Sequence, residues 1–176
     1  MQPRVIGLDL SLTATGMALP DGSLDVIVPA KGLTGVARLQ AIRAEIFRRI
    51  LPPATDLAVI EGPAYSRAAG AGHHEAAGLW WLVVYEMTAR GVHHAIVPPT
   101  TLKRYATGKG TATKADMRMA LYRREDRDVR DDNMVDARWL ALMGLDHLGH
   151  PLVEVPKTHR DALAKVAWPE VTRGTA

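Results

Sequence analysis

Four acidic residues stand at positions where a folded core normally excludes charge. Asp9 interrupts one apolar run, and Glu61 directly follows another. Asp132 and Asp136 are four residues apart, so they share one face of a helix. Burying several carboxylates together is unfavourable unless a cation neutralises them. Oxygen ligands suit Mg²⁺ or Mn²⁺, and two such ions can activate a water molecule and stabilise the leaving oxygen of a phosphodiester.

Each of these acids, taken alone, also has an ordinary structural explanation. Asp9 fits a turn or an edge position, and Glu61, which precedes Gly62-Pro63, fits a loop. Asp131 or Asp132 is suited to cap the helix that follows. The four acids together, with a basic segment between the second and the third, favour the metal site.

The positive charge of the chain is concentrated in one segment. The net charge is +3, yet residues 1–100 carry eight basic and eight acidic residues. Residues 101–130 carry nine basic and four acidic residues, and residues 131–176 carry five and seven. This basic segment indicates a surface that faces a polyanion, with a solvated helix face as the alternative.

Apolar patterning predicts the elements that must position the four acids. Three short segments at the start of the chain predict a strand meander, and later segments alternate between helices and strands. The expected strands are 4–10, 16–19, 24–28, 57–60 and 93–97, and the expected helices are 36–51, 70–90, 98–103, 113–123 and 131–147. Strands interleaved with helices predict an α/β protein with a mixed sheet covered by helices, in the order of a ribonuclease-H-like domain.

Length and composition set further bounds. The 176 residues predict one domain over 1–150, followed by a loosely packed C-terminal tail over 151–176, where proline, threonine and charged residues become denser. The absence of cysteine excludes disulfides and cysteine-based zinc sites. The longest uncharged apolar stretch, 76–85, is too short for a membrane span, and Asp9 falls where a signal peptide needs apolar residues. We therefore expect a cytoplasmic protein with no membrane segment.

Four motifs, in chain order, resemble the RuvC family of Holliday-junction resolvases. The family's first strand and hairpin resemble VIGLDLSLTATG at 5–16, and its second acidic motif resembles AVIEGP at 58–63. Its two-lysine segment resembles PPTTLK at 98–103 with TGKGTATK at 107–114, and the start of its last catalytic helix resembles DNMVDA at 132–137. The matches run from about residue 4 to residue 148.

The resemblance implies an RNase-H-like fold with a mixed five-stranded sheet, a homodimer, and incision of branched DNA such as a four-way junction. It implies Mg²⁺ as cofactor, with Mn²⁺ as an alternative and two ions in each active site. By position, Asp9, Glu61 and Asp136 become metal ligands. Lys103 and Lys114 become phosphate-facing residues near the scissile bond, and we count Lys114 among the catalytic residues.

The chain departs from the family pattern at the fourth ligand. The family often has a carboxylate or a histidine three residues before the last aspartate, and here that residue is Asn133. The additional acid, Asp132, lies four residues before Asp136. Either Asp132 takes the ligand's place, or Asn133 binds through its amide oxygen while Asp132 caps the helix. Charge favours Asp132, because an anionic oxygen holds a hard divalent ion better than a neutral amide does.

Further residues are candidates for DNA contact and for dimer formation. Tyr65 lies in the loop where the family places a residue against unpaired bases, and stacking there is the hypothesis. The other candidate DNA contacts are Lys109, Arg104 and Arg118. Trp80 and the helix around it resemble the dimer face, because Leu79 and Trp81 add apolar surface outside the stripe that faces the sheet.

Two alternative functions stay open from the sequence. One is an RNase-H-like nuclease that acts on RNA–DNA hybrids or flap DNA. The other is a junction-binding module without catalytic activity. Incision of a synthetic four-way junction with Mg²⁺, compared with a linear duplex and an RNA–DNA hybrid, would separate these two from a junction resolvase.

Overall fold

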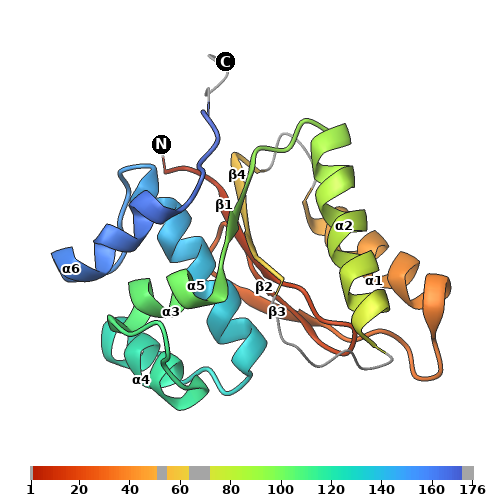
Figure 1. The fold of residues 1–176 in the computed structure, drawn as a ribbon, viewed down its shortest axis with the longest axis horizontal. Coiled ribbons are helices and arrows are strands. Elements are labelled where there is room, and N and C mark those ends of the chain that lie inside the picture. The colour runs from red at the N-terminus through yellow and green to blue at the C-terminus, as the bar shows by residue number, and fades with distance from the viewer. Residues whose placement is uncertain (1, 51–54, 64–71, 172–176) are drawn as a thin grey trace.

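The protein folds around one mixed sheet of five strands, which lies between two layers of helices (Figure 1). The computed structural model describes residues 2–50, 55–63 and 72–171. The strands are β1 (Val5–Asp9), β2 (Thr15–Ala18), β3 (Leu24–Ile27), β4 (Leu57–Glu61) and β5 (His94–Val97). They are ordered β3-β2-β1-β4-β5, with β1 to β3 antiparallel and with β4 and β5 parallel to β1. The predicted RNase-H-like α/β fold is confirmed.

The helices cover both faces of this sheet. They are α1 (Gly35–Arg49), α2 (His73–Ala89), α3 (Pro99–Thr107), α4 (Lys114–Glu125), α5 (Asp132–His147), α6 (Lys157–Arg160) and the 3₁₀ helix η1 (Asp161–Lys165). Figure 1 shows α1 and α2 on one side of the sheet and α3, α4 and α5 on the other. The short helix predicted over 98–103 is longer than expected, because it ends only where Gly108 takes up the left-handed conformation.

Strand alternation assigns side chains to the two cores. In β1, Val5 belongs to the core on the α5 side, and Ile6 and Leu8 belong to the core on the α1 and α2 side. In β4, Val59 lies in the α5-side core and Ile60 in the opposite one. Because side chains alternate along a strand, the last residues of β1 and β4 turn toward α5.

Helix α5 approaches the sheet closely enough to require glycine. A Cβ atom on Gly7 would lie 1.9 Å from the carbonyl oxygen of Ala137, and one on Gly16 would lie 2.1 Å from that of Asn133. No side chain fits at either position, so the backbone of α5 rests directly on β1 and β2. This contact sets how far the first turns of α5 lie from the end of β1.

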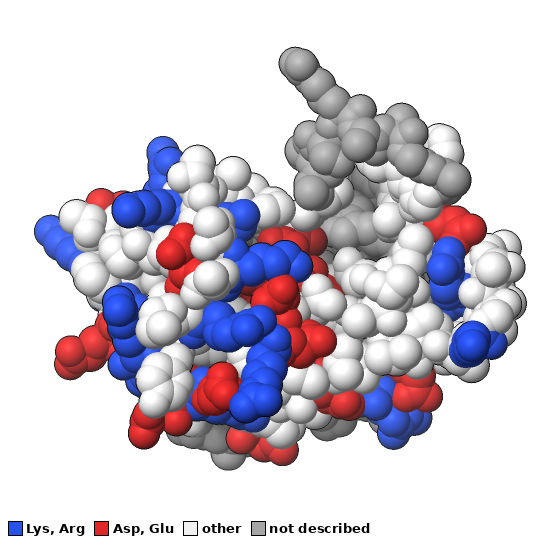
Figure 2. Space-filling model, turned by 90° about the horizontal axis from the view of Figure 1, so that it is seen from below, with Lys and Arg blue, Asp and Glu red and all other residues white. Residues whose placement is uncertain are grey.

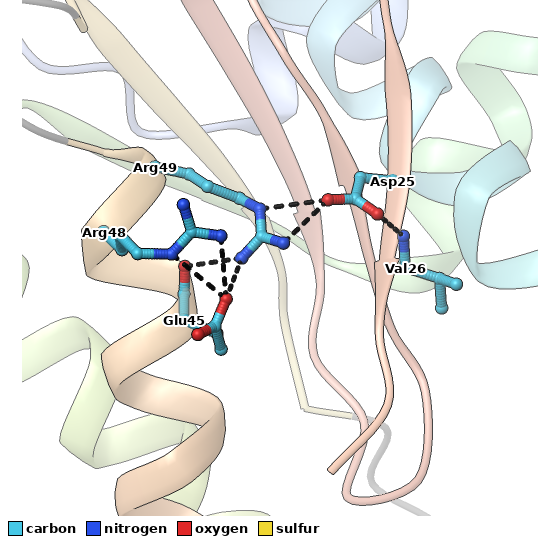
Figure 3. Close-up of polar contacts among 5 residues, drawn as sticks. All are labelled: Asp25, Val26, Glu45, Arg48 and Arg49. Carbon is cyan, nitrogen blue, oxygen red and sulfur yellow. Dashed lines mark hydrogen bonds and ion pairs between the residues drawn. The ribbon is translucent and has the colours of Figure 1, made fainter.

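A polar network ties α1 to the edge strand β3 (Figure 3). Arg49 pairs with Asp25 at 2.9 Å and with Glu45 at 2.6 Å. Arg48 also pairs with Glu45, at 3.0 Å. The network lies on the side of the sheet away from α5, where it holds an edge element and contacts none of the acidic site.

The C-terminal segment, described as far as Val171, is anchored on the α5-side core at a few apolar residues, where we expected a loosely packed tail. Ala162 and Val166 are buried in the α5-side core, and Trp168 packs against the same core. Arg160 pairs with Asp146 of α5 at 2.6 Å. The high density of proline and charge hid these apolar anchors. Across the described residues, no helix is long and apolar enough to cross a membrane.

Candidate active site

Three of the predicted acids lie together at the carboxyl end of the central strands. Asp9 ends β1 and Glu61 ends β4. The two strands are parallel, and Leu8 pairs with Ile60, so the next residue of each strand comes beside the other. Asp136 lies in the second turn of α5, which the close contact at Gly7 holds against β1. Strand register and helix packing thus bring together residues that are far apart in the sequence.

The carboxyl group of Asp9, which is buried, interacts with that of Glu61, which is partly buried. Burial, together with the charges of Glu61 and Asp136, raises the pKa of Asp9 to about 9. Burial and the charge of Asp136 also raise the pKa of Glu61, to about 7. A hydrogen bond joins the two carboxyl groups and favours the proton on Asp9. The pair therefore retains a proton in a range where isolated carboxyl groups are ionised.

Asp136 and two lysines complete the electrostatics of the site. Burial raises the pKa of Asp136 to about 6, and the positive charges of Lys114 and Lys103 oppose that rise. The same two lysines lower the pKa of Glu61. Lys103 of α3 and Lys114 of α4 thus act electrostatically on the acidic residues, and neither neutralises them fully.

The oxygen donors of the site suit a hard cation, but their side chains are not already arranged around one. Asp9, Glu61 and Asp136 supply oxygen donors, and their raised pKa values show negative charge that lacks compensation. Among the residues that the structure describes, no three acidic or histidine side chains are already arranged to hold a metal ion. A bound cation would therefore draw these carboxylates closer together. The residues fit Mg²⁺ or Mn²⁺ by their chemistry, and binding requires their side chains to adjust.

Asp132 faces the lysine side of the site. Its carboxylate pairs with Lys114 at 3.2 Å and with Arg118 at 2.8 Å. Although burial opposes it, these contacts lower the pKa of Asp132. Its charge also acts on Asp136, more weakly than Lys114 does. In this arrangement Asp132 fixes two cations beside the acidic site, a contact that the sequence did not indicate.

Asn133, the other candidate for the fourth ligand, is used in packing. Its amide nitrogen donates a hydrogen bond of 2.7 Å to the carbonyl oxygen of Ala14. That contact ties the first turn of α5 to the turn between β1 and β2. Asp131 caps the same helix by accepting a hydrogen bond of 3.0 Å from the backbone of Met134. Asp131, rather than Asp132, is therefore the N-cap.

Trp80 touches the site in a way that sequence reasoning missed. Its indole nitrogen donates a hydrogen bond of 3.0 Å to the backbone carbonyl of Glu61. Trp80 also lines a hollow of about 250 Å³ with Asp9 and Glu61. The apolar spacing of α2 identified Trp80 as a packing or interface residue, but no local signal connects an indole N–H to a strand end nineteen residues away.

The remaining candidates lie at different distances from the acids. Arg118 is bound to Asp132 and to the carbonyl oxygen of Arg130. Arg104 is exposed in the second half of α3. Lys109 is exposed in the loop before α4 and lines a different hollow, beside Asp116. Tyr65 lies outside the described residues.

Basic and acidic side chains meet on one face of the molecule. Figure 2 shows Lys and Arg gathered on the side that carries α3 and α4, next to a group of acidic side chains. Lys114 and Arg118, both on α4, make the contact through their ion pairs with Asp132. A polyanion that meets this face is attracted by the cations and is brought beside the carboxylates.

Comparison with known proteins identifies the fold. No family model matches the chain, and no curated protein sequence matches it either. The solved structure of Thermus thermophilus RuvC is similar, with a TM-score of 0.65, 17% identity, and coverage of 87% of this chain and 99% of RuvC. The structure of Thermus thermophilus RuvC in complex with a Holliday junction substrate gives a TM-score of 0.64, 17% identity, and coverage of 88% and 100%. The chain has a RuvC-like fold, which extends over nearly its whole length.

Proposed function

We propose that this protein is a structure-selective endodeoxyribonuclease that resolves Holliday junctions or other branched DNA by metal-dependent phosphodiester hydrolysis. The observation that carries the proposal is the cluster of Asp9, Glu61 and Asp136, one buried and two partly buried carboxyl groups with raised pKa values. Acidic residues that serve only to stabilise a fold are normally paired with basic groups or hydrogen-bond donors. A site that binds divalent cations needs several carboxylates that are not already neutralised in this way.

The proposed ligands of two Mg²⁺ ions are the carboxylates of Asp9, Glu61 and Asp136. Bound there, the ions would supply Lewis-acid chemistry, activating water and stabilising charge on the leaving oxygen. Mn²⁺ prefers the same donors. Asp132 is the remaining candidate, and its pairing with Lys114 and Arg118 supports a positioning role in the proposed mechanism.

Lys114 and Lys103 are the proposed phosphate-facing residues. Both act electrostatically on Glu61 and Asp136, so their charges lie within reach of the reaction site. Asp132 holds the ammonium group of Lys114 at 3.2 Å. A cation fixed before the reaction stabilises the charge that develops on the phosphate without reorganising at that moment.

Branched DNA is the proposed substrate, on two supports. The fold is shared with RuvC, which is also known in a complex with a Holliday junction substrate. The basic segment 101–130 supplies most of α3 and α4, which border the acidic site. Phosphate contacts of this kind give affinity for nucleic acid without reading its sequence.

A homodimer formed through α2 completes the proposal. Trp81 is 64% exposed and Tyr85 is 71% exposed, one helical turn apart. Leu79, which we expected to add to the outer surface, is buried in the core instead, so Trp81 and Tyr85 carry the exposed apolar face. Exposed aromatic pairs of this kind are typical of interfaces.

The test of activity is incision of a synthetic four-way junction in Mg²⁺, compared with a linear duplex of the same sequence and an RNA–DNA hybrid. We expect cutting of the junction and little cutting of the other two. Preferential cutting of the hybrid would replace the proposal with an RNase-H-like activity. Binding of the junction without cutting would leave a non-catalytic junction module.

The test of the dimer is sedimentation of the wild type and of Trp81→Glu at micromolar concentration. We expect the wild type to sediment as a dimer and the variant to shift toward the 19.1 kDa monomer. Tyr122→Glu is the matched control, because Tyr122 is an exposed aromatic residue of α4. A wild type that remains monomeric both alone and with junction DNA would contradict the dimer.

A further inference from the structure

A second cationic site lies on the far side of α4 from the acidic cluster. A hollow of about 390 Å³ opens between α3, α4 and α6. Its basic side chains are Lys109, Arg123, Arg124 and His159. Arg123 follows Arg118 by five residues, which places it about 140° around the helix from the residues that face Asp132. The hollow is thus separate from the active-site face.

The cations of this hollow lack acidic partners. Within the described ranges, none of Lys109, Arg123 and Arg124 makes an ion pair with a carboxylate. Burial lowers the pKa of Arg124, and the neighbouring positive charge of Arg123 adds to that effect. Like charges held close together are unfavourable unless an anion is shared between them.

The single carboxylate in the lining, that of Asp116, is already used by the protein. It accepts hydrogen bonds of 2.8 Å from both the backbone nitrogen and the hydroxyl of Thr113, as the capping box of α4. Lys109 acts on it only at longer range. Asp116 therefore offsets part of the positive charge but leaves the cations of the hollow free for an outside ligand.

Two of the basic groups are held in place. Arg124 donates to the carbonyl oxygens of Glu154 at 3.2 Å and Ala120 at 3.1 Å. The ring of His159 lies against Gly108, where an added Cβ would come within 2.5 Å of its Nε2. The Nδ1 atom of His159 is buried without a hydrogen-bond partner. The ring therefore belongs to the lining of the hollow together with Arg124, and one of its nitrogens makes no hydrogen bond within the described part of the protein.

We propose that this hollow is a second phosphate-binding site, formed by Lys109, Arg123, Arg124 and His159. Its volume of about 390 Å³ leaves room for more than one phosphate group, and the proposed carrier of the phosphate is either a nucleic-acid strand or a free nucleotide. Binding of a nucleic-acid phosphate rests on the proposed function, because a junction arm bound at the acidic site would extend beyond it toward this hollow. The nucleotide source does not depend on the acidic cluster.

The first arm of the test measures affinity for a four-way junction by fluorescence anisotropy in EDTA, where no cutting occurs. The variant is Lys109→Gln with Arg123→Gln, both exposed residues whose replacement leaves the core intact. We expect affinity to fall about fivefold or more, and the slope of log affinity against log salt to decrease by about 1. The charge-matched control, Lys31→Gln with Arg48→Gln, changes two exposed residues outside α3 and α4, one in the loop before α1 and one in α1.

The second arm uses inorganic phosphate and 5′-deoxyadenylate as probes. We expect both to shift the imidazole NMR signals of His159 in the wild type and to shift them less in the variant. Phosphate-dependent shifts with unchanged junction affinity would assign the site to free nucleotides. If the variant and the control showed the same junction affinity and the same phosphate-induced shifts of the His159 signals, the proposal would be overturned. Neither arm measures cleavage, so both can be interpreted even if the acidic cluster proves to have no nuclease activity.

Discussion

Helix α5 carries a partly buried acid, Asp136, in its second turn and a buried acid, Asp146, near its end, and the surroundings of the two carboxyl groups differ. Asp146 is 3% exposed, and its carboxylate accepts from Tyr105 at 3.0 Å and from Arg160 at 2.6 Å. Asp136, ten residues earlier, faces Asp9 and Glu61 and has a raised pKa. One acid is balanced by fixed donors, and the other adds to a group of like charges. Lack of compensation, rather than burial, is what distinguishes a candidate reaction site from a structural one.

The largest expected effect is at the uncompensated end. Asp9→Asn should lower junction cleavage by about a thousandfold or more, because it removes a proposed metal ligand with almost no change in volume. Without metal, the same variant should be more stable at pH 8, by at least about 1 kcal/mol, since one pKa unit corresponds to about 1.4 kcal/mol. Cleavage rates and urea unfolding measure the two effects. Near wild-type cleavage would refute the assignment.

Removing the positive charge of Lys114, beside the acidic cluster, should lower the cleavage rate more than the affinity for DNA. Lys114→Ala should slow cleavage by about a hundredfold, because loss of one fixed donor to the developing charge costs about 3 kcal/mol in the barrier. Lys109→Ala is the comparison, since Lys109 lies on the other side of α4 and should mainly weaken binding. Single-turnover rates and anisotropy separate the two. Identical profiles for both variants would remove the distinction.

At the compensated end, the sign of the stability change should reverse. Asp146→Asn should destabilise the protein by about 1–3 kcal/mol, because the buried hydroxyl of Tyr105 loses its charged acceptor. The free energy of unfolding measures this. Asp128→Asn, which breaks only an exposed ion pair with Arg130, should leave stability unchanged. If Asp146→Asn stabilised the protein, the charge of Asp146 would be as poorly compensated as that of Asp136, and the comparison would fail.

The comparison also predicts a pH dependence. Asp9, Glu61 and Asp136 have folded-state pKa values of about 9, 7 and 6, all above their ordinary range. The stability that their protonation contributes is therefore fully present below about pH 4, and it is lost as the pH rises from about 4 through the folded pKa values of 6, 7 and 9. Without metal, the urea midpoint of the wild type should fall over that interval, and that of Asp9→Asn should fall less. Added Mg²⁺ should raise the wild-type midpoint at pH 8.

The smallest expected effect concerns the orientation of Glu61. Trp80→Phe keeps an aromatic ring but loses the N–H bond to the carbonyl of Glu61, so we assign Trp80 as a positioning residue. Loss of about 1 kcal/mol should lower cleavage about fivefold and raise the Mg²⁺ concentration needed for half-maximal rate. Tyr122→Phe, at an exposed position of α4 outside the proposed dimer face, is the control. An unchanged Mg²⁺ requirement would limit Trp80 to packing.

Sequence patterns predicted the acidic ends of β1 and β4 because strand alternation and charge are both local signals. Asp9 and Glu61 each follow residues whose apolar character marks a buried strand. The contacts of Asp132 were not predicted, since spacing on α5 places it beside Asp136 but says nothing about Lys114 on another helix. The packed C-terminal segment was missed for a similar reason. Ala162 and Val166 lie in a short apolar stretch that follows a segment rich in proline and charge, and only tertiary contact shows which of its residues are buried.

The close contact at Gly7 has a consequence for how the chain tolerates change. Even one methyl group there would collide with the backbone of Ala137, next to Asp136. The same residue thus governs both the seating of α5 and the spacing between acids on two elements. A survey of random substitutions should find Gly7 as intolerant as Asp9, although glycine has no chemical group to offer. Homologues that keep this spacing of the acidic residues should therefore also keep glycine at this position, because any side chain there would move α5 away from β1.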